Sequence, residues 1–441
     1  MAENSKVRDL YEAFPFPARS PGRDGPESLP LTRTDILGKV DHHLFGGRRD
    51  FRQGFRTLVA GGGTGDAAIF LAAQLQDCEA EVVCLDLSEA SLAIARQRAA
   101  ALGLESRIRW VRASLLEAPR LGLGLFDYIT CLGVLHHLAD PDAGLRALVE
   151  VLGEGGGMGL MVYGRYGRAD IYAMQDLMRL VNRDEADLRR QVENCRESAR
   201  ALSPAHLMLR GRSREQLTAM LADDANLADT FLHPQDRAYT VPELHRFVED
   251  AGLQVVNFTN FHTTLRLEYE PETYLGDAPL NRQLAGRDVR ERQAIGELLH
   301  GHMYVHGFYA ARSAGTAASF LDAEMVPYFL SAAAAEAAGQ LRTQGAGSVK
   351  LSSRQRLRIQ PSRAALECLG LVDGVRDLGR IWAEAAARLQ LAPAELAASV
   401  APEFERFNAL NWVFLRHKSC APSPMLAYAF RGDAARIEPA G

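Results

Sequence analysis

The feature that most constrains how this chain folds is a glycine-rich turn between a β-forming segment and a helix-forming segment. Residues 55–59 are rich in β formers, and residues 67–73 form an apolar, helix-compatible run. Between them Gly61, Gly63 and Gly65 occupy every second position. Glycines let the chain turn sharply and let a ligand approach bare backbone. A strand, a glycine turn and a helix in this order are typical of the nucleotide-binding edge of an open α/β sheet.

The spacing of the glycines indicates which kind of ligand the turn binds. Dinucleotide-binding turns use G-x-G-x-x-G and seat a pyrophosphate at the helix N-terminus. This chain has G-x-G-x-G, and Asp66 stands where the third fingerprint glycine would fall. We expect a carboxylate there to repel a pyrophosphate. The turn therefore favours an adenosyl ligand without phosphate, such as S-adenosylmethionine (SAM).

The next segment predicts a second strand with an acid at its end. Residues 81–85 form an apolar β-type run, and Asp86 follows directly. An acid about 20 residues beyond the glycines is positioned to accept hydrogen bonds from both ribose hydroxyls. Ser88 is a plausible N-cap for the amphipathic helix that follows. Further strands are predicted at residues 108–111, at 126–138, where the strand runs into a loop, and at 158–163.

Five segments of the chain resemble the class I SAM-dependent methyltransferases in order and spacing. They are VAGGGTGD at 59–66, LDLS at 85–88, SLLE at 114–117, FDYITCLGVLHHL at 126–138 and GEGGGMGLMVY at 153–163. The resemblance covers roughly the first two-thirds of the chain. It implies SAM as cofactor and an α/β fold with a doubly wound sheet of seven strands, six parallel and one antiparallel.

The resemblance also implies which residues contact the cofactor. Asp86 would hold the ribose, Ser114 and Leu115 would flank the adenine, and the glycines would line the methionine and ribose. The family usually has an acid two residues before the first glycine, where this chain has Val59. The amino group of SAM would then be held by backbone carbonyls or by another residue. The full predicted set is Ala60, Gly61, Gly62, Gly63, Gly65, Asp86, Leu87, Ser114, Leu115, Leu132 and Gly133.

Four side chains are candidates for work on the methyl acceptor. His136, followed by His137, invites interpretation as a general base, since histidine titrates near neutrality; the HHL pattern is common in the resembled family without a metal. Tyr163 and Arg165 follow the fifth strand, and Arg165 is either a surface residue or a bidentate ligand for a carboxylate or phosphate. His233 belongs to a polar group that either forms the rim of the site or anchors the cap. No metal site is predicted.

The order of segments predicts three parts. Residues 1–45 form a leader whose stretch 7–19, rich in proline and aromatic residues, is expected to be extended and to act as a lid or as a surface arm. Residues 46–313 form the methyltransferase domain, with a helical cap inserted at about 166–238 and the last two strands at 253–258 and 303–310. Residues 314–441 form a smaller α+β or winged-helix-like accessory domain, which stabilises, dimerises or presents a polypeptide.

Composition narrows the classes of partner and compartment. The formal net charge of -5 gives no global basic excess, which disfavours binding to nucleic acid through phosphate contacts. The six cysteines show no C-x-x-C pair and no zinc spacing. The polar N-terminus is no secretory signal, and charges and a proline interrupt the apolar runs near 317–338. We expect a cytoplasmic protein without a membrane span.

Three classes of function compete at this point. The first is methyl transfer from SAM to a capped, small or lipophilic acceptor, with a protein or peptide presented by the C-terminal domain as the alternative acceptor. The second is a SAM-binding regulatory protein that transfers nothing, which the valine at position 59 keeps open. The third, an NAD-dependent oxidoreductase, is disfavoured by the glycine spacing and by Asp66.

Overall fold

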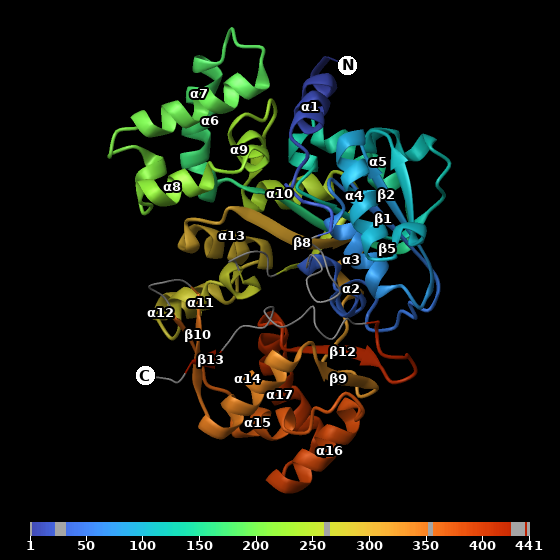
Figure 1. Ribbon diagram of the computed structural model, residues 1–441. Helices are drawn as coiled ribbons and strands as arrows, with labels where there is room; N and C mark the ends of the chain where they lie inside the picture. Colours follow the sequence, from blue (N-terminus) through green and yellow to red (C-terminus); the bar gives the residue numbers. More distant parts are fainter. Residues whose placement is uncertain (1, 23–31, 260–264, 352–355, 425–436, 439–441) are drawn as a thin grey trace.

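A mixed sheet forms the centre of the protein (Figure 1). The computed structural model describes residues 2–22, 32–259, 265–351, 356–424 and 437–438. The strand order is β3-β2-β1-β4-β5-β8-β7, and a short β6 pairs with β5. The strands are β1 (Gln53–Ala60), β2 (Glu79–Asp86), β3 (Ile108–Arg112), β4 (Phe126–Leu132), β5 (Leu152–Gly164), β6 (Ala238–Tyr239), β7 (Gln254–Phe258) and β8 (Val305–Ala311).

The direction of the strands confirms the predicted sheet. β8 pairs antiparallel with both β5 and β7, whereas the pairs β1–β2, β1–β4, β2–β3 and β4–β5 are parallel. The seven long strands therefore comprise six of one direction and one of the other. The chain order reverses between β1 and β4, and open α/β sheets bind ligands in the crevice at such a reversal.

Helices cover both faces of the sheet and bury two separate hydrophobic clusters. One cluster joins the sheet to α2, α3 and α4, and the other joins it to α5 and α10. The predicted cap at Ser88 is present, since its hydroxyl accepts the Ser91 N–H at 3.1 Å. These helices are α2 (Leu37–Leu44), α3 (Asp66–Gln74), α4 (Glu89–Ala101), α5 (Pro141–Glu150) and α10 (Val241–Glu249); α11 (Glu272–Leu275), α12 (Pro279–Leu284) and α13 (Val289–His300) follow β7.

Short 3-10 helices occur in several of the connections. They are η1 (Arg33–Asp35), η2 (Glu105–Arg107), η3 (Leu115–Arg120), η4 (Leu135–His137), η5 (Tyr166–Arg168), η6 (Leu207–Leu209), η7 (Arg266–Tyr269) and η8 (Ala314–Thr316). None of the helices in the described part of the chain is long and apolar enough to cross a membrane.

The segment after β5 is helical, as its pattern predicts. It contains α6 (Ala169–Val181), α7 (Leu188–Ala201), α8 (Arg214–Met220) and α9 (Asp224–Phe231). Met174, Met178 and Met208 are buried in a cluster that these helices form with Leu10 and Phe14 of the leader. The methionines of this insertion are therefore core residues. Figure 1 places the insertion and the leader helix together at one end of the molecule.

The leader differs from its predicted conformation. Residues 7–13 belong to a helix, α1 (Ala2–Ala13), and only the residues after it leave helical geometry. The reason is that prolines begin only at Pro15, whereas Val7, Leu10 and Phe14 recur at helical spacing and so form one apolar face. The prediction of an extended segment over all of 7–19 was wrong.

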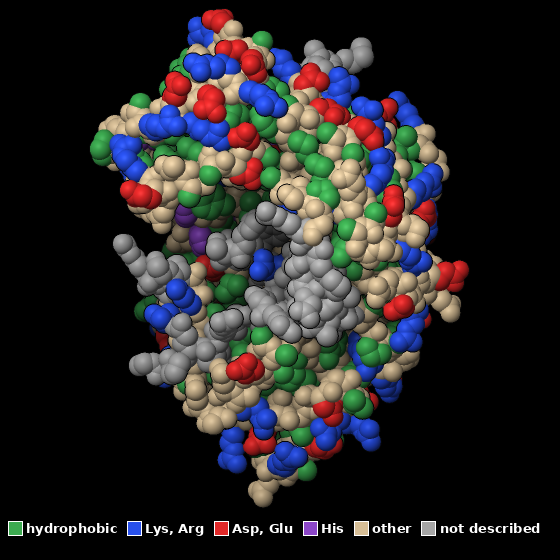
Figure 2. All heavy atoms as spheres, in the orientation of Figure 1, with side chains coloured by type: hydrophobic (Ala, Val, Ile, Leu, Met, Phe, Trp, Pro, Cys, Tyr) green, Lys and Arg blue, Asp and Glu red, His purple; other side chains and the backbone are tan. Residues whose placement is uncertain are grey.

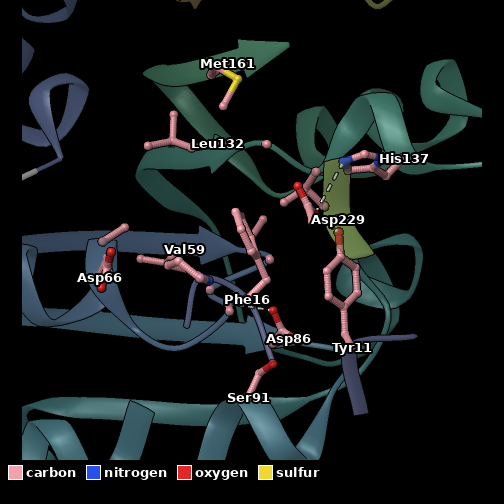
Figure 3. Close-up of a pocket in the computed structure, with 18 of the residues that line it drawn as sticks. Tyr11, Phe16, Val59, Asp66, Asp86, Ser91, Leu132, His137, Met161 and Asp229 are labelled. Carbon is pink, nitrogen blue, oxygen red and sulfur yellow. Dashed lines mark hydrogen bonds and ion pairs between the residues drawn. The ribbon is translucent and has the colours of Figure 1, made fainter. Parts of the chain in front are cut away.

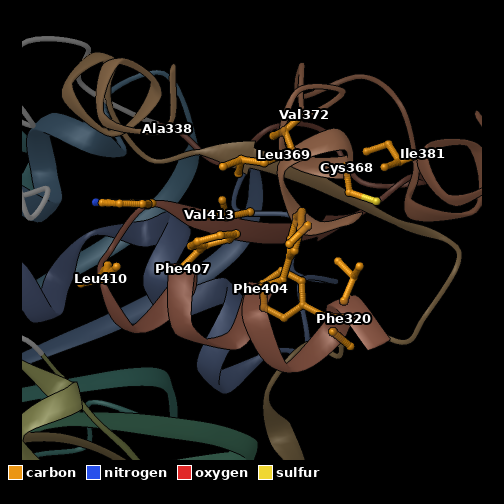
Figure 4. Packing of buried hydrophobic residues seen from close by; sticks show 14 of the residues in the cluster. Phe320, Ala338, Cys368, Leu369, Val372, Ile381, Phe404, Phe407, Leu410 and Val413 are labelled. Atoms are coloured by element: carbon orange, nitrogen blue, oxygen red, sulfur yellow. The ribbon is translucent and has the colours of Figure 1, made fainter. Parts of the chain in front are cut away.

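The C-terminal residues fold as an α+β unit, one of the two predicted alternatives. Two small antiparallel sheets, β12-β9 and β11-β10-β13, accompany four helices. Phe404, Phe407 and Leu410 pack in its core (Figure 4). The elements are β9 (Met325–Phe329), α14 (Ala332–Gln344), β10 (Gly347–Lys350), β11 (Arg356–Ile359), α15 (Arg363–Leu369), α16 (Leu378–Leu389), α17 (Pro393–Ala409), β12 (Val413–His417) and β13 (Ile437–Glu438).

Helix α2 joins this unit to the sheet. The His42 Nδ1 atom accepts the Leu415 N–H of β12 at 3.2 Å, and the Thr316 hydroxyl donates to the His43 carbonyl at 2.8 Å. Asp41 is 1% exposed and accepts the Arg49 N–H at 2.9 Å. Burial raises the pKa of Asp41 to about 7. The junction thus contains a carboxyl group that is more easily protonated in the folded chain than in the unfolded one.

Replacing Asp41 by Asn tests whether burial of this carboxyl group makes the stability of the protein depend on pH. An acid whose pKa is raised by folding stabilises the fold while it is protonated, and this contribution is lost as pH rises through about 7. We expect Asp41→Asn to raise the free energy of unfolding at pH 8 by about 1–3 kcal/mol, and the difference to vanish towards pH 4. Urea unfolding at several pH values measures it, with the exposed Asp50→Asn as control. Equal gains at pH 4 and pH 8 would contradict the argument.

Candidate active site

A cavity of about 550 Å³ lies at the carboxyl ends of β1, β2 and β4. The leader and the helical insertion complete its walls (Figure 3). A volume of this size is typical of small-molecule and cofactor sites. The structure brings nearly all of the predicted cofactor residues together along this cavity: Ala60, Gly61, Gly62, Gly63, Asp86, Leu87, Ser114, Leu115, Leu132 and Gly133.

The leader passes so close to the glycine turn that position 63 has no room for a side chain. A Cβ on Gly63 would lie 2.6 Å from the Phe16 carbonyl oxygen, and the residue has a φ of +51°. The Thr64 N–H donates to this same carbonyl at 3.3 Å, and its hydroxyl donates to the Pro17 carbonyl at 2.8 Å. Close approach of the leader is therefore a sufficient reason for glycine at this position.

Gly65, in contrast, lies outside the lining residues. It is the N-cap of α3 with a φ of +100°, and a Cβ here would lie 2.8 Å from the Cβ of Ala95 in α4. Its place among the predicted cofactor contacts is thus not supported by the geometry. The residue lets α3 and α4 pack closely, whereas the third glycine of dinucleotide-binding turns lets a helix pack on a strand.

Asp86 occupies the predicted position beside the turn. Its carboxylate accepts the Gly63 N–H at 2.7 Å and the Ser88 N–H at 2.8 Å, one on each oxygen. Each oxygen keeps a lone pair, so both can still accept a ribose hydroxyl. Burial raises the pKa of Asp86, and the hydrogen bonds from the backbone oppose this. The site therefore fits the sugar of an adenosyl ligand.

The carboxylate of Asp66 is paired with two arginines. Arg98 lies 2.7 Å and Arg19 2.6 Å from its oxygens. Burial alone would raise the pKa of Asp66, but the two guanidinium groups lower it overall. The argument that this carboxylate repels a pyrophosphate was therefore wrong in its physics, because its charge is compensated by residues distant in the sequence. The choice of SAM rests on the other features of the site.

A second polar group lies at the other end of the cavity. The Tyr11 hydroxyl donates to the Asp229 carboxylate at 2.8 Å, and the Tyr163 hydroxyl lies 3.4 Å from its second oxygen. The His137 Nε2 atom is 4.0 Å from the nearer carboxylate oxygen (Figure 3). All four side chains line the cavity and come from α1, α9, β5 and η4.

Of the four candidates for acceptor chemistry, only Tyr163 lines the cavity. His136 is fully buried behind it, with ring centroids 3.7 Å apart, and its neighbour His137 lines the cavity instead. His233 packs against His137, with ring centroids 3.7 Å apart, and does not line the cavity. Arg165 points elsewhere, because its guanidinium lies 2.8 Å from the Glu243 carboxylate. We therefore propose no direct role for His136, Arg165 or His233.

Sequence reasoning missed Asp229 and gave Tyr11 no role of its own. Asp229 lies in α9, where Ala225, Ala228 and Phe231 are buried with it. An acid among apolar residues at helical spacing is the one sequence signal that could have found it, since unpaired acids are rarely buried. Its partner Tyr11 is 218 residues away, so no local pattern connects the two.

Comparisons with known proteins agree with this geometry. A family model described as a methyltransferase domain matches residues 58–158. An uncharacterized protein of Synechococcus sp., syc1184_c, is 33% identical over 309 residues, which cover 70% of this chain and 71% of that protein. The chain belongs to the class I SAM-dependent methyltransferases. As in this family, its cofactor is SAM.

Two further similarities differ in how much of this chain they cover. The ubiquinone/menaquinone biosynthesis C-methyltransferase UbiE of Idiomarina loihiensis is 33% identical over 105 residues, 24% of this chain and 41% of that enzyme. The chain thus spans less than half the length of that relative. The structure of PKMT2 from Rickettsia typhi in complex with AdoHcy matches 90% of this chain and 77% of its own, with a TM-score of 0.55 and 12% identity. The latter likeness shows the fold alone.

The packing role of Gly65 predicts a loss of stability on substitution. Gly65→Ala places a methyl group against Ala95 and also forces an L residue into left-handed geometry. Gly103→Ala shares the positive φ but has open space around its Cβ, so it is the matched control. We expect Gly65→Ala to lower the free energy of unfolding by about 1–3 kcal/mol more than Gly103→Ala does. Equal losses in denaturant titrations would show that helix packing does not require this glycine.

The proposed ribose role of Asp86 predicts weaker cofactor binding in Asp86→Asn. The amide has one acceptor oxygen fewer and turns a donor towards N–H groups that now bind a carboxylate. We expect binding of S-adenosylhomocysteine to weaken by about 1–3 kcal/mol in calorimetric titrations. Asp140→Asn is the control, because Asp140 caps α5 outside the cavity and Asn is also a good cap. An isotherm like that of the wild type would remove Asp86 from the site.

Proposed function

We propose that this methyltransferase methylates a small organic acceptor enclosed beneath helices α6–α9. The observation that carries the proposal is one continuous cavity that extends from the glycine turn to Asp229 in the insertion. Its lining combines the four polar side chains at the acceptor end with apolar ones. These apolar residues include Val7, Val134, Leu138, Met161 and Val305. Such a lining suits an acceptor with an apolar body and one polar reactive group.

Positioning is the main contribution that the protein makes to this reaction. A nucleophile held in line behind a methyl group gains about 7–11 kcal/mol over free reactants. Two neighbouring side chains hold the Tyr163 ring in place. The Arg168 Cζ atom lies 3.4 Å from the centre of the ring, and the His136 ring packs against it. Arg168 is itself fixed by Asp236 at 2.9 Å. We propose that Tyr163, Tyr11, Asp229 and His137 orient the acceptor.

We further propose that the leader acts as a lid over bound SAM. Besides the contacts at the glycine turn, the Glu12 carboxylate accepts the N–H groups of Glu89 and Ala90 at 2.8 and 3.2 Å, at the N-terminus of α4. Tyr11 and Phe16 line the cavity from this side. A leader bound in this way would exclude water from the methyl group and would have to open for exchange of the cofactor.

A polypeptide acceptor is the second candidate. It would draw on the C-terminal unit, part of which must lie within the 90% of this chain that matches the fold of PKMT2. Against it, Figure 1 places the C-terminal unit at the end of the molecule opposite the insertion. We therefore propose that residues 314–441 are an accessory domain. A nucleic acid is disfavoured as the methyl acceptor. On the face drawn in Figure 2, positive and negative side chains are interspersed and form no continuous basic patch.

Labelling with SAM that carries a deuterated methyl group tests the proposal. The purified full-length protein is incubated with a bacterial extract, and mass spectrometry follows the label in the low-molecular-mass fraction and in the protein fraction. We expect enzyme-dependent label in low-molecular-mass compounds. Label confined to proteins would favour the second candidate. S-adenosylhomocysteine binding without any transfer would favour a regulatory SAM-binding protein, and an extract without enzyme is the control.

A further inference from the structure

His137 presents an unused hydrogen-bond acceptor to the cavity. Its Nδ1 atom lies 2.9 Å from the Gln235 carbonyl oxygen, which only accepts, so Nδ1 carries a proton. Burial lowers the pKa of His137 to about 4, so the ring is neutral near pH 7. Nε2 therefore holds a lone pair. It is buried and has no hydrogen-bond partner among the described residues.

Asp229 presents a second acceptor to the same space. Its carboxylate is buried, and both neighbouring phenols are placed to donate to it. One of its oxygens faces the lone pair of His137 across 4.0 Å (Figure 3). Two acceptors turned towards each other in a buried space are unfavourable, because neither supplies a proton. A ligand group that donates two hydrogen bonds would satisfy both.

The charges around the cavity favour a cation at this position. Five charged residues of the described chain line it. Arg19 and Asp66 pair with each other, Arg168 pairs with Asp236, and Asp86 lies at the ribose end. Burial holds the pKa of His136 and His233 below the ordinary value, so these rings are neutral as well. Asp229 is thus the one carboxylate at the acceptor end that forms no ion pair with a lysine or arginine among the described residues; burial raises its pKa, and Arg168 nearby opposes this shift.

We infer that the methyl acceptor is an amine, which binds as an ammonium group between Asp229 and His137. This inference rests on the proposed methyl transfer and names the class of its acceptor. An ammonium group donates to both acceptors at once, whereas a hydroxyl has one hydrogen and can satisfy only one of them. An acceptor that carries a carboxylate or phosphate next to the reactive atom would be repelled by Asp229.

The same geometry accounts for the proton balance. The bound ammonium gives one proton to the Asp229 carboxylate, whose pKa is raised by burial, and this frees the nitrogen lone pair while His137 Nε2 accepts a remaining N–H and keeps the group in place. The nitrogen then attacks the methyl carbon. The N–C bond forms as the C–S bond breaks, and S-adenosylhomocysteine leaves with the electron pair of that bond. The proton on Asp229 returns to solvent when the product leaves, and no oxidant or reductant is needed.

The accepting atom is identified by fragmentation of the products that carry the deuterated methyl group. Label on nitrogen supports the inference, whether the amine is a small molecule or a lysine side chain. The two sources separate in the experiment, since the first appears in the low-molecular-mass fraction and the second in protein hydrolysates. Label on oxygen, carbon or sulfur overturns the inference and leaves methyl transfer intact. Absence of label overturns both.

Asp229→Asn tests the role of the charge with the labelled amine as substrate. We expect KM for the amine to rise about 30- to 1000-fold, while S-adenosylhomocysteine binds as in the wild type. Asp224→Asn is the control, because it makes the same change on the same helix outside the cavity. An unchanged KM in Asp229→Asn would contradict the inference. If this variant does not fold, His137→Phe, which removes the acceptor, replaces it, with an expected rise in KM for the amine of about 10-fold and an unchanged KM as the contradicting result.

Discussion

The hydrogen bond from the Gly63 amide to the Asp86 carboxylate connects the parts on which the site depends. It ties the turn after β1 to the end of β2 across 2.7 Å, and so places Asp86, the proposed ribose acceptor, beside bare backbone. The same glycine, because it lacks a Cβ, lets the Phe16 carbonyl approach from the leader. A side chain at this position would displace either the leader or the turn. One residue therefore determines both where the cofactor would lie and how the leader can cover it.

The leader in turn joins the cofactor end of the cavity to the acceptor end. Glu12 binds the N-terminus of α4 next to Asp86, while the preceding residue, Tyr11, donates to Asp229 in the insertion. Leu10 and Phe14 add to the apolar core of that insertion. Since these contacts lie within five residues of one another, the leader cannot leave one end of the cavity and stay fixed at the other. Release of the cofactor would then also loosen the group that orients the acceptor.

The sheet and the cofactor end could be predicted from the sequence because their signals are local. Strand, glycine turn, acid and cap follow one another within short segments. The positions of Asp86 and Ser88 could therefore be predicted from the residues next to them in the sequence. The acceptor end could not be predicted in the same way. Asp229 meets Tyr11 only through the packing of α9 on α1, and Asp66 meets Arg98 only through the packing of α3 on α4. Which of His136 and His137 faces the cavity depends on the orientation of the single helical turn that contains them. The hydrophobic periodicity of the sequence does not determine that orientation.

The fate of the two arginines after β5 decides what the acceptor end can bind. When the sequence is considered alone, Arg165 suggests a site for an anion, and Arg168 follows it in the same segment. In the folded chain Glu243 pairs with the first and Asp236 with the second, so neither guanidinium is left uncompensated. Asp229 has no such cation and instead receives hydrogen bonds from neutral phenols. An end of the cavity that looks cationic along the sequence is therefore anionic in three dimensions, and it is this reversal of sign that selects an ammonium group over a carboxylate.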